Sequence, residues 1–377
     1  MRTLVISDLH LGALNEEDLL RHAEVRAPLI AAAREADRVV ILGDGLELRQ
    51  VPQRDAAEAA RPFFAELGEA CSDLLVLTGN HDHGLTAAWI EAKLEEEAPG
   101  FLGLEQRIEP EEAGFLATAL AEAACTQGTV PSVQLCTQGT VPSVQLAYPG
   151  VWLREDVYAM HGHYLDLHTT VPAIEALAAS AMARWVTRTG GGPATPDDYE
   201  AALAPLYAWL HQLAQRADHR ATVAGGSVSS RAWVALAGEG AKRKPVRRAL
   251  LGTGYAAGVA ALNRAGLGPL ERDLSGPALR RGGLRGMREV TRRLGIDAPY
   301  VLFGHTHRSG PWPGDDEREW RTPAGGALIN TGSWVYQPHF IGRTRPGESP
   351  YWPGTAVWVE ETGPPQLVRL LTEPLPV

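Results

Sequence analysis

Residues 3–10 read TLVISDLH, a short apolar run that ends in the polar pair Asp8 and His10. Its β-branched composition predicts a buried strand over Arg2–Ser7. The same arrangement recurs in VVILGD at 39–44, LLVLTGNHD at 74–82, VYAMHGH at 157–163 and YVLFGHTH at 300–307. Because strand ends in an α/β sheet meet at one edge, we expect the polar side chains that follow these runs to lie together.

The segments between the first strands are rich in Ala, Leu and Glu, a composition that favours helices. We expect helices over Asn15–Arg34, Gln53–Ala70, Leu85–Glu97, Val171–Arg188 and Pro196–Gln215. We expect further strands over Arg38–Leu42, Leu74–Thr78, Val151–Met160, Tyr300–Phe303, Ala327–Thr331, Ala356–Glu360 and Leu367–Leu371. Alternating strands and helices predict an α/β fold.

A change of composition marks residues 167–297, which are rich in Ala, Gly and Arg. We interpret 167–297 as a helical cap inserted into a domain formed by 1–166 and 298–377. Within it, residues 228–293 hold 14 Lys or Arg against four acidic residues. Such a segment is either a solvated helix face or a surface that receives an anionic substrate.

The whole chain is acidic, with a formal net charge of -10, so it has no broad attraction for nucleic acid or anionic membranes. Its three cysteines make neither a disulfide framework nor a zinc-ribbon spacing. With no secretory signal and no run long enough for an integral membrane span, these features favour a cytoplasmic protein, either free or peripheral to a membrane. The repeat of CTQGTVPSVQL at 125–135 and 136–146 is interpreted as a duplication within a surface loop.

The residues that follow the strands are suited to metal binding. Asp8 and Asp44 offer carboxylate oxygens, and Asn80 offers an amide oxygen. Imidazole nitrogens come from His10, His161, His305 and His307. In Asp8-x-His10 and His305-x-His307 the two-residue spacing projects both side chains to one side of an extended chain. A mixed oxygen and nitrogen set without thiolate suits Mn, Fe or Zn. Gly43, Gly79 and Gly304 precede these residues, as expected where the chain turns tightly off a strand.

The ordered set D-x-H, GD-x-x-D/E, GNHD, an isolated His and GHTH resembles the calcineurin-like metallophosphoesterase superfamily. The resemblance implies a four-layer α/β/β/α sandwich with two divalent cations, most often Mn²⁺, with Fe or Zn as alternatives. It assigns one cation to Asp8, His10, Asp44 and His307. It assigns the other to Asp44, Asn80, His161 and His305, with Asp44 bridging the two.

The resemblance also implies a reaction, in which a metal-bound hydroxide attacks the phosphorus of a phosphoester or pyrophosphate. His81 would stabilise the transferring phosphoryl group or protonate the leaving oxygen, and Asp82 would orient His81. Glu47 stands where Asp is common, and the bridging ligand is unaffected by that change. His83 and His163 are either neighbours of the ligands or purely structural.

Within the superfamily the chain is similar to the UDP-2,3-diacylglucosamine hydrolases in GD-x-x-E, in GHTHR at 304–308 and in NTGSW at 330–334. It departs from them at His163, where Asp is expected, and in the duplication and the basic cap. The substrate is expected to be a phosphorylated small molecule or a lipid-like one. Arg308 would bind its phosphate and Asn330 would position a ligand, with an exposed arginine and a strand end as the alternatives.

Two other functions fit parts of the sequence. A nuclease of the same superfamily would use the basic segment to bind nucleic acid, against the acidity of the rest of the chain. A non-catalytic interaction scaffold would retain the fold with a decayed site, which the complete ligand set contradicts.

Overall fold

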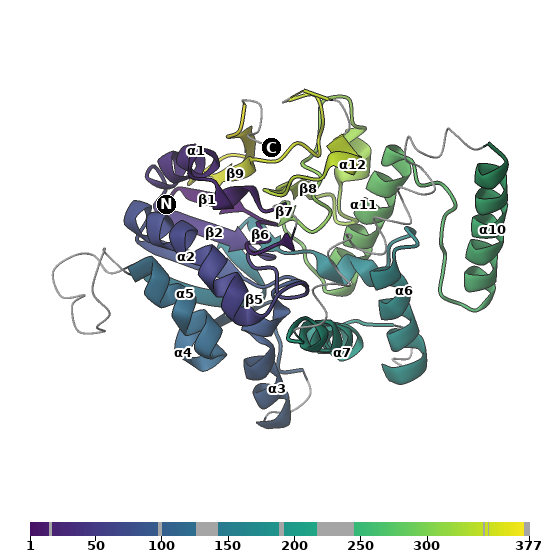
Figure 1. The fold of residues 1–377 in the computed structure, drawn as a ribbon, viewed down its shortest axis with the longest axis horizontal. Helices are drawn as coiled ribbons and strands as arrows, with labels where there is room; N and C mark the ends of the chain where they lie inside the picture. Colours follow the sequence, from purple (N-terminus) through teal and green to yellow (C-terminus); the bar gives the residue numbers. More distant parts are fainter. Residues whose placement is uncertain are drawn as a thin grey trace.

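Two β-sheets joined by one long strand form the centre of the computed structural model (Figure 1). The structure describes residues 1–14, 17–96, 100–125, 142–187, 192–216, 245–341, 344–345 and 347–372. The first sheet has the order β10 (Gln366–Arg369), β9 (Thr355–Val359), β1 (Thr3–Ile6), β2 (Arg38–Leu42), β3 (Asp73–Leu77) and β5 (Ser143–Arg154). Its strands β1, β2, β3 and β5 run parallel, and β4 (Glu105–Ile108) pairs with β5 antiparallel.

The long strand β5 carries the chain into the second sheet. Its first half, from Ser143 to Ala147, pairs with β3, and its second half, from Gly150, pairs with β6 (Val157–Met160). There β6, β7 (Tyr300–Phe303) and β8 (Ala327–Asn330) run parallel. The two sheets therefore share β5, with one half of the strand in each sheet.

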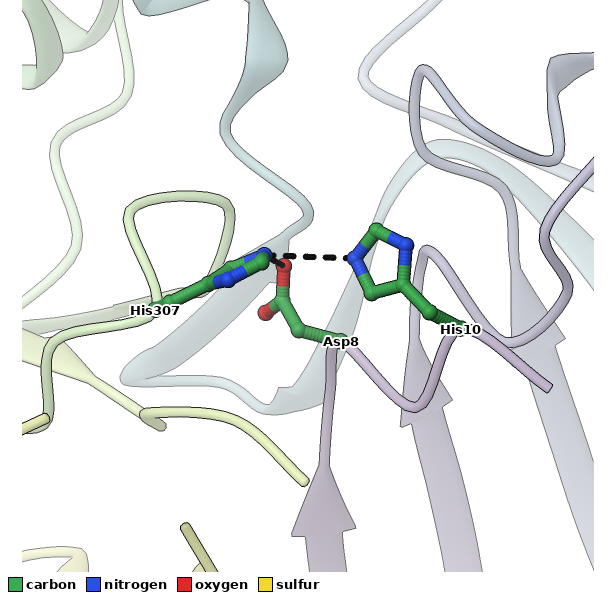
Figure 2. Close-up of side chains that lie close together, drawn as sticks. All are labelled: Asp8, His10 and His307. Carbon is green, nitrogen blue, oxygen red and sulfur yellow. Dashed lines mark hydrogen bonds and ion pairs between the residues drawn. The ribbon is translucent and has the colours of Figure 1, made fainter. Parts of the chain in front are cut away.

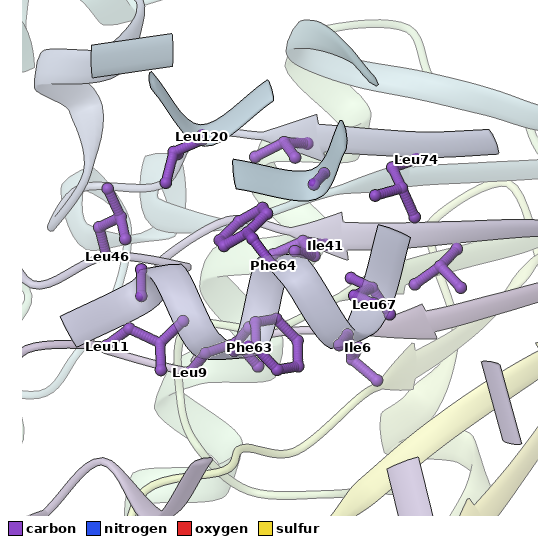
Figure 3. Packing of buried hydrophobic residues seen from close by; sticks show 14 of the residues in the cluster. Ile6, Leu9, Leu11, Ile41, Leu46, Phe63, Phe64, Leu67, Leu74 and Leu120 are labelled. Atoms are coloured by element: carbon purple, nitrogen blue, oxygen red, sulfur yellow. The ribbon is translucent and has the colours of Figure 1, made fainter. Parts of the chain in front are cut away.

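Alternating side chains divide each strand between two cores. Val5, Val40 and Leu75 of the first sheet pack with Val157 and Leu302 of the second. Ile6, Ile41 and Leu74 point the other way, against Phe63, Phe64 and Leu67 (Figure 3). The helices on that outer face include α1 (Ala23–Ala33), α2 (Gln53–Ala70), α3 (Ala87–Glu96) and α5 (Phe115–Cys125).

The outer face of the second sheet is covered by two helices from the segment 167–297. Met287 and Val290 of α11 (Gly276–Arg293) pack with Met160 and Val301, and Leu203 of α7 (Pro196–Ala214) belongs to the same cluster. The order of layers is thus helix, sheet, sheet, helix, which confirms the α/β/β/α sandwich. α7 and α11 lie within the proposed cap, yet they pack directly on the second sheet. The bounds of the cap at 167 and 297 stay a prediction.

Local sequence signals explain where these helices begin. α7 starts with a capping box, in which Thr195 accepts from the Asp198 amide and Asp198 accepts from the Thr195 amide. α11 starts after Ser275, whose side chain accepts from the Ala278 amide. The other elements of this region are α6 (Ile174–Ala181), a π-helix η5 (Met182–Thr187) and α10 (Pro245–Arg264), which stands at the edge of the molecule (Figure 1).

Most predicted elements occur with bounds shifted by one to four residues, and α2, β2 and β7 match throughout. Two predictions are wrong in kind. The helix predicted over Asn15–Arg34 begins only at Ala23, after a 3-10 turn η2 (Leu19–Arg21). The single strand predicted over Val151–Met160 is a hairpin, because a turn at Glu155 and Asp156 separates β5 from β6.

Among the described elements for which no range was predicted are β4, α4 (Pro110–Ala113), α5, α10, α11 and α12 (Pro338–Ile341). The loop predicted for the duplicated CTQGTVPSVQL lies mostly outside the described residues, which omit 126–141. The prediction is wrong for Ser143–Leu146, which form the start of β5 and pair with β3. Residues 217–244, which contain part of the basic segment, also lie outside the described residues. Within the described part of the chain, no helix combines the length and the apolar character needed to cross a bilayer.

Candidate metal centre

The ends of five strands converge on one edge of the sandwich. In both sheets these strands run parallel, so their carboxyl ends lie on the same side. Each is followed within four residues by a predicted ligand: Asp8 after β1, Asp44 after β2, Asn80 after β3, His161 after β6 and His305 after β7. His10 and His307 follow two residues after Asp8 and His305. All seven predicted ligands are thereby brought into one cluster.

Asp8, His10 and His307 make the first half of the cluster, with their polar atoms turned toward one another (Figure 2). The Nε2 atoms of His10 and His307 are 3.2 Å apart, and Nε2 of His307 is 3.3 Å from Oδ1 of Asp8. The potential ligand atoms of this group all lie within 4.8 Å of one another. This spacing is suited to a single cation between them.

Asp44 links this group to a second one. Its Oδ2 lies 3.6 Å from Nε2 of His10 and 3.2 Å from Nε2 of His161, while its Oδ1 accepts from the His81 amide at 2.8 Å. Asn80 completes the second group, with Oδ1 at 3.3 Å from Nε2 of His161 and 3.0 Å from Nδ1 of His305. One carboxylate oxygen is therefore fixed by the backbone, and the other faces both groups.

Backbone strain is concentrated at the same residues. In the described part of the chain, the non-glycine residues with positive φ are Asp8, His10, Asp44, His305 and His307, with φ between 46° and 67°. A left-handed conformation costs a residue other than glycine about 1–3 kcal/mol. Such strain persists where the surrounding structure imposes it, and it is typical of functional sites. Here the Asp44 carbonyl accepts from the amides of Leu9 and His10, which holds the first two loops together.

Two carboxylates, the buried Glu47 and the half-buried Asp166, orient several of the rings. Oε2 of Glu47 lies 3.1 Å from Nδ1 of His10 and 2.7 Å from Nδ1 of His81. Oδ1 of Asp166 lies 3.0 Å from Nε2 of His305. A ligand histidine typically donates its other ring N–H to a carboxylate or a carbonyl in this way. Asp166 was missed in the sequence, where only its place in HGHYLD, five residues after His161, hinted at a role.

The charges in the cluster stabilise one another. Burial disfavours protonation of His10, but its bond to Glu47 and the charge of Asp44 outweigh that and raise its pKa to about 9. His161 is buried too, and Asp44 raises its pKa to about 10. Burial also acts against ionisation of Asp44, yet His161 and His81 hold the pKa of this carboxyl well below its usual range. Protons and cations therefore compete for the same atoms.

Asp82 was predicted to orient His81, and this prediction is wrong. Asp82 is fully buried, and its oxygens accept from the amides of Gly79, Asp44 and Gly45 at 2.6, 3.2 and 2.7 Å. It ties together the loops after β2 and β3, whereas the His81 ring contacts Glu47. Nε2 of His81 lies 3.2 Å from Nη1 of Arg49, a residue that the sequence analysis did not identify. Burial lowers the pKa of His81, so the ring donates to Glu47 and accepts from Arg49.

The two residues predicted to bind substrate are held by the protein itself. Arg308 forms a two-pronged ion pair with Asp315, at 2.9 and 2.8 Å, and only 7% of its surface is exposed. This pair disfavours the predicted phosphate contact, and Arg308 is not the exposed arginine of the alternative either. Asn330 donates to the Gly304 carbonyl and to Thr306 Oγ1, both at 2.9 Å, and accepts from Gly332. Asn330 thus positions the loop that carries His305 and His307.

His83 and His163 belong to a buried polar network behind the cluster. Nε2 of His83 lies 2.8 Å from Oε2 of Glu200, a residue of α7, and Tyr148 and Tyr164 donate to the other oxygen of that carboxylate. Nε2 of His163 lies 3.3 Å from the Tyr148 hydroxyl. The network anchors α7 to the loop after β3, so both histidines have structural contacts.

A cavity of about 180 Å³ opens beside His305. Apolar and aromatic side chains form most of its wall, among them Leu165, Val171, Leu279, Leu284, Phe303, Trp320, Phe340 and Tyr351. Its two arginines are neutralised, since Arg308 pairs with Asp315, and Arg280 pairs with Asp315 and Glu319. The cavity therefore suits an apolar group that lies next to the cluster.

Comparison with known proteins agrees with this geometry. The family model described as calcineurin-like phosphoesterase matches residues 1–177. No curated protein matches the chain.

Proposed function

We propose that the protein is a phosphoesterase that uses two divalent cations, and the match of residues 1–177 to the family model described as calcineurin-like phosphoesterase supports this. The family match contains Asp8, His10, Asp44, Asn80 and His161. His305 and His307 lie outside the matched residues, and β7 brings them to the same cluster. The proposed ligand set thus extends beyond the matched segment.

The observation that carries the proposal is the position of Asp44 Oδ2 between His10 and His161. A carboxylate placed in this way can bridge two cations. Asp8, His10, Asp44 and His307 would hold one, and Asp44, Asn80, His161 and His305 the other. The donors are oxygens and imidazole nitrogens, which suit Mn²⁺ and equally Fe or Zn.

Two bound cations supply Lewis-acid charge and lower the pKa of a water molecule. The residues of the chain supply the remaining chemistry. His81 lies against His10, with ring centroids 4.4 Å apart, and its Nε2 side faces Arg49. Arg49 would contact the oxygens of the transferring phosphoryl group and stabilise the charge that develops on them. His81 would join it with a proton on Nε2, in place of the bond that Nε2 accepts from Arg49 in this structure.

The apolar cavity beside His305 supports a substrate with an apolar group next to its phosphoester or pyrophosphate. A phosphorylated small molecule and a lipid-like one both have this character. A cytoplasmic location and manganese as the physiological metal are part of the same proposal.

The test is hydrolysis of bis-(4-nitrophenyl) phosphate with added Mn²⁺, together with the metal content of the purified protein. Asp44→Asn should lose both cations and most of the activity, because it weakens both halves of the centre. Asp156→Asn is the control, since Asp156 pairs with Arg154 near the turn between β5 and β6. An Asp44→Asn protein with full metal-dependent activity would refute the proposal.

A further inference from the structure

A second cavity, of about 750 Å³, lies alongside the first. Thr169 and Leu284 line both cavities, so the two adjoin. Its wall comes from the end of the 3-10 helix η4 (His163–Leu167), from the loop after α10 and from α11. The first cavity, with its apolar wall, therefore lies between His305 and the second, larger cavity.

Three arginines of α11 line the larger cavity: Arg281, Arg285 and Arg288. Their spacing of four and three residues places them on one side of the helix. On the other side of α11, Met287 and Val290 enter the core on the second sheet. The packing of α11 thus fixes which way the arginine side faces. We call these three residues the arginine row.

The arginine row differs from the other arginines of α11 in its partners. Arg280 pairs with Asp315 and Glu319, and both Arg292 and Arg293 pair with Glu289. In the part of the chain that the structure describes, no hydrogen bond or ion pair within 4 Å involves the side chains of the arginine row. Asp273 is near enough to Arg281 for a weak electrostatic effect, which is a minor cause of its lowered pKa.

The acidic residues of the same wall are already largely neutralised. Glu289 and Glu319 line the cavity, but each is paired with an arginine outside the row. Glu271 is the third acid of the wall. His168 adds no charge, because burial lowers its pKa to about 4. Three guanidinium groups therefore face this space against a single carboxylate that no ion pair neutralises.

We propose that the arginine row binds a second anionic group of the substrate, a phosphate or a carboxylate, separated from the scissile phosphoester by an apolar segment. Guanidinium groups bind such planar or tetrahedral anions with paired N–H donors. The order of features along the cavities is cluster, apolar wall and arginine row, and it matches the order of groups in such a substrate. The inference rests on the proposed function for the site of cleavage.

Two substrates that differ only in the distal group test this inference: hexyl phosphate and 6-phosphonohexyl phosphate. With Mn²⁺ the wild-type protein should prefer the second in kcat/KM. The variant R281Q/R285Q/R288Q should lose about tenfold or more of that preference, since one charge-assisted contact contributes roughly a factor of ten. Because the arginines are exposed, the preference should also shrink as salt concentration rises.

A matched control carries the same loss of charge elsewhere. R34Q/R54Q/R61Q removes three exposed arginines at α1 and α2, on the far side of the first sheet, and should keep the wild-type preference. Thermal unfolding checks that both triple variants fold. If R281Q/R285Q/R288Q does not fold, the single variant R285Q replaces it.

Binding of hexane-1,6-diphosphonate in the presence of a chelator gives a readout that is independent of catalysis. The arginine-row variant should bind this probe about tenfold or more weakly than wild type. Equal binding by wild type and variant would overturn the inference, and so would hydrolysis without any preference for the distal anion. Binding that depends on the arginine row with no hydrolysis of any phosphoester would instead overturn the phosphoesterase assignment. If binding of an oligonucleotide requires the arginine row and binding of the diphosphonate does not, the ligand of the row is nucleic acid.

Discussion

The Oδ1 atom of Asp166 lies 3.0 Å from Nε2 of His305. The other nitrogen of that ring, Nδ1, faces Asn80 and the centre of the cluster. Asp166 therefore sets the direction in which His305 presents Nδ1 to a cation. Asp166→Asn should weaken Mn²⁺ binding by about 10–100-fold, the usual cost of losing a partner behind a ligand. A metal titration of the chelated protein measures this, with Asp156→Asn as control. Wild-type affinity in Asp166→Asn would show that the ring is held by other contacts.

Glu47 is expected to matter for two rings at once. Its Oε2 contacts Nδ1 of both His10 and His81, and Glu47→Gln removes the charge while keeping the size of the side chain. We expect a loss of metal affinity of about 10–100-fold and a larger loss of activity, because His81 also loses its acceptor. Glu66→Gln, which removes the partner of Arg26 on the outer helices, should leave both quantities unchanged. Equal metal affinity in Glu47→Gln and wild type would contradict the assigned contact.

Metal binding should release protons at neutral and mildly alkaline pH. The pKa of His10 is raised to about 9 and that of His161 to about 10, so both rings are protonated below those values. A cation binds only the neutral ring and must displace the proton. Affinity should therefore rise with pH and level off near pH 10. Calorimetry at pH 8 in buffers of different ionisation enthalpy measures the released protons, and a heat independent of the buffer would contradict the prediction.

The sequence was sufficient to place the seven candidate ligands, because each follows a buried strand and the parallel arrangement brings strand ends together. Their partners were harder to predict. Asp166 meets His305 across 139 residues of chain, through the packing of η4 against β7, and no local pattern encodes that contact. Asp82 was given the wrong partner for the same reason, since proximity in sequence to His81 says nothing of where the side chain points.

Errors in the fold have physical causes of a similar kind. The apolar alternation of β5 continues into β6, so the hairpin between them looked like one strand. The three charged residues Arg154, Glu155 and Asp156 interrupt the pattern. The place of α11 in the outer layer of the second sheet was also hidden in the sequence, although the helix itself is strongly amphipathic. One side of α11 is rich in arginine and the other holds glycines and the apolar Met287 and Val290, but this pattern does not say which sheet the apolar side covers.

Asn330 should contribute both to stability and to the metal centre. It is 1% exposed and makes three hydrogen bonds to the loop of His305 and its surroundings. Asn330→Ala leaves buried partners without a bond, which costs about 1–3 kcal/mol in the free energy of unfolding. Asn263→Ala is a matched control, because Asn263 bonds the backbone of Leu270 in the turn after α10. Both variants should lower the midpoint of urea unfolding, and only Asn330→Ala should also weaken Mn²⁺ binding. If both variants weakened Mn²⁺ binding to the same extent, the effect of Asn330→Ala would reflect general destabilisation and not a role at the metal centre.

Gly79 tests how tightly the cluster is packed. A Cβ atom at this position would lie against Oδ1 of Asp44 and 2.6 Å from Nε2 of His161, the two side chains that connect the halves of the centre. Neither can yield without leaving its place, so Gly79→Ala should abolish binding of at least one cation and destabilise the fold by more than about 1 kcal/mol. Gly258→Ala is the control, since a Cβ there meets no atom within 4 Å. An alanine inside a helix is favoured over glycine by about 0.5–1 kcal/mol, so the control should be slightly stabilised. Metal content and urea unfolding of the two variants decide the matter, and a Gly79→Ala protein with two bound cations would show that the loops after β2 and β3 can separate without loss of the site.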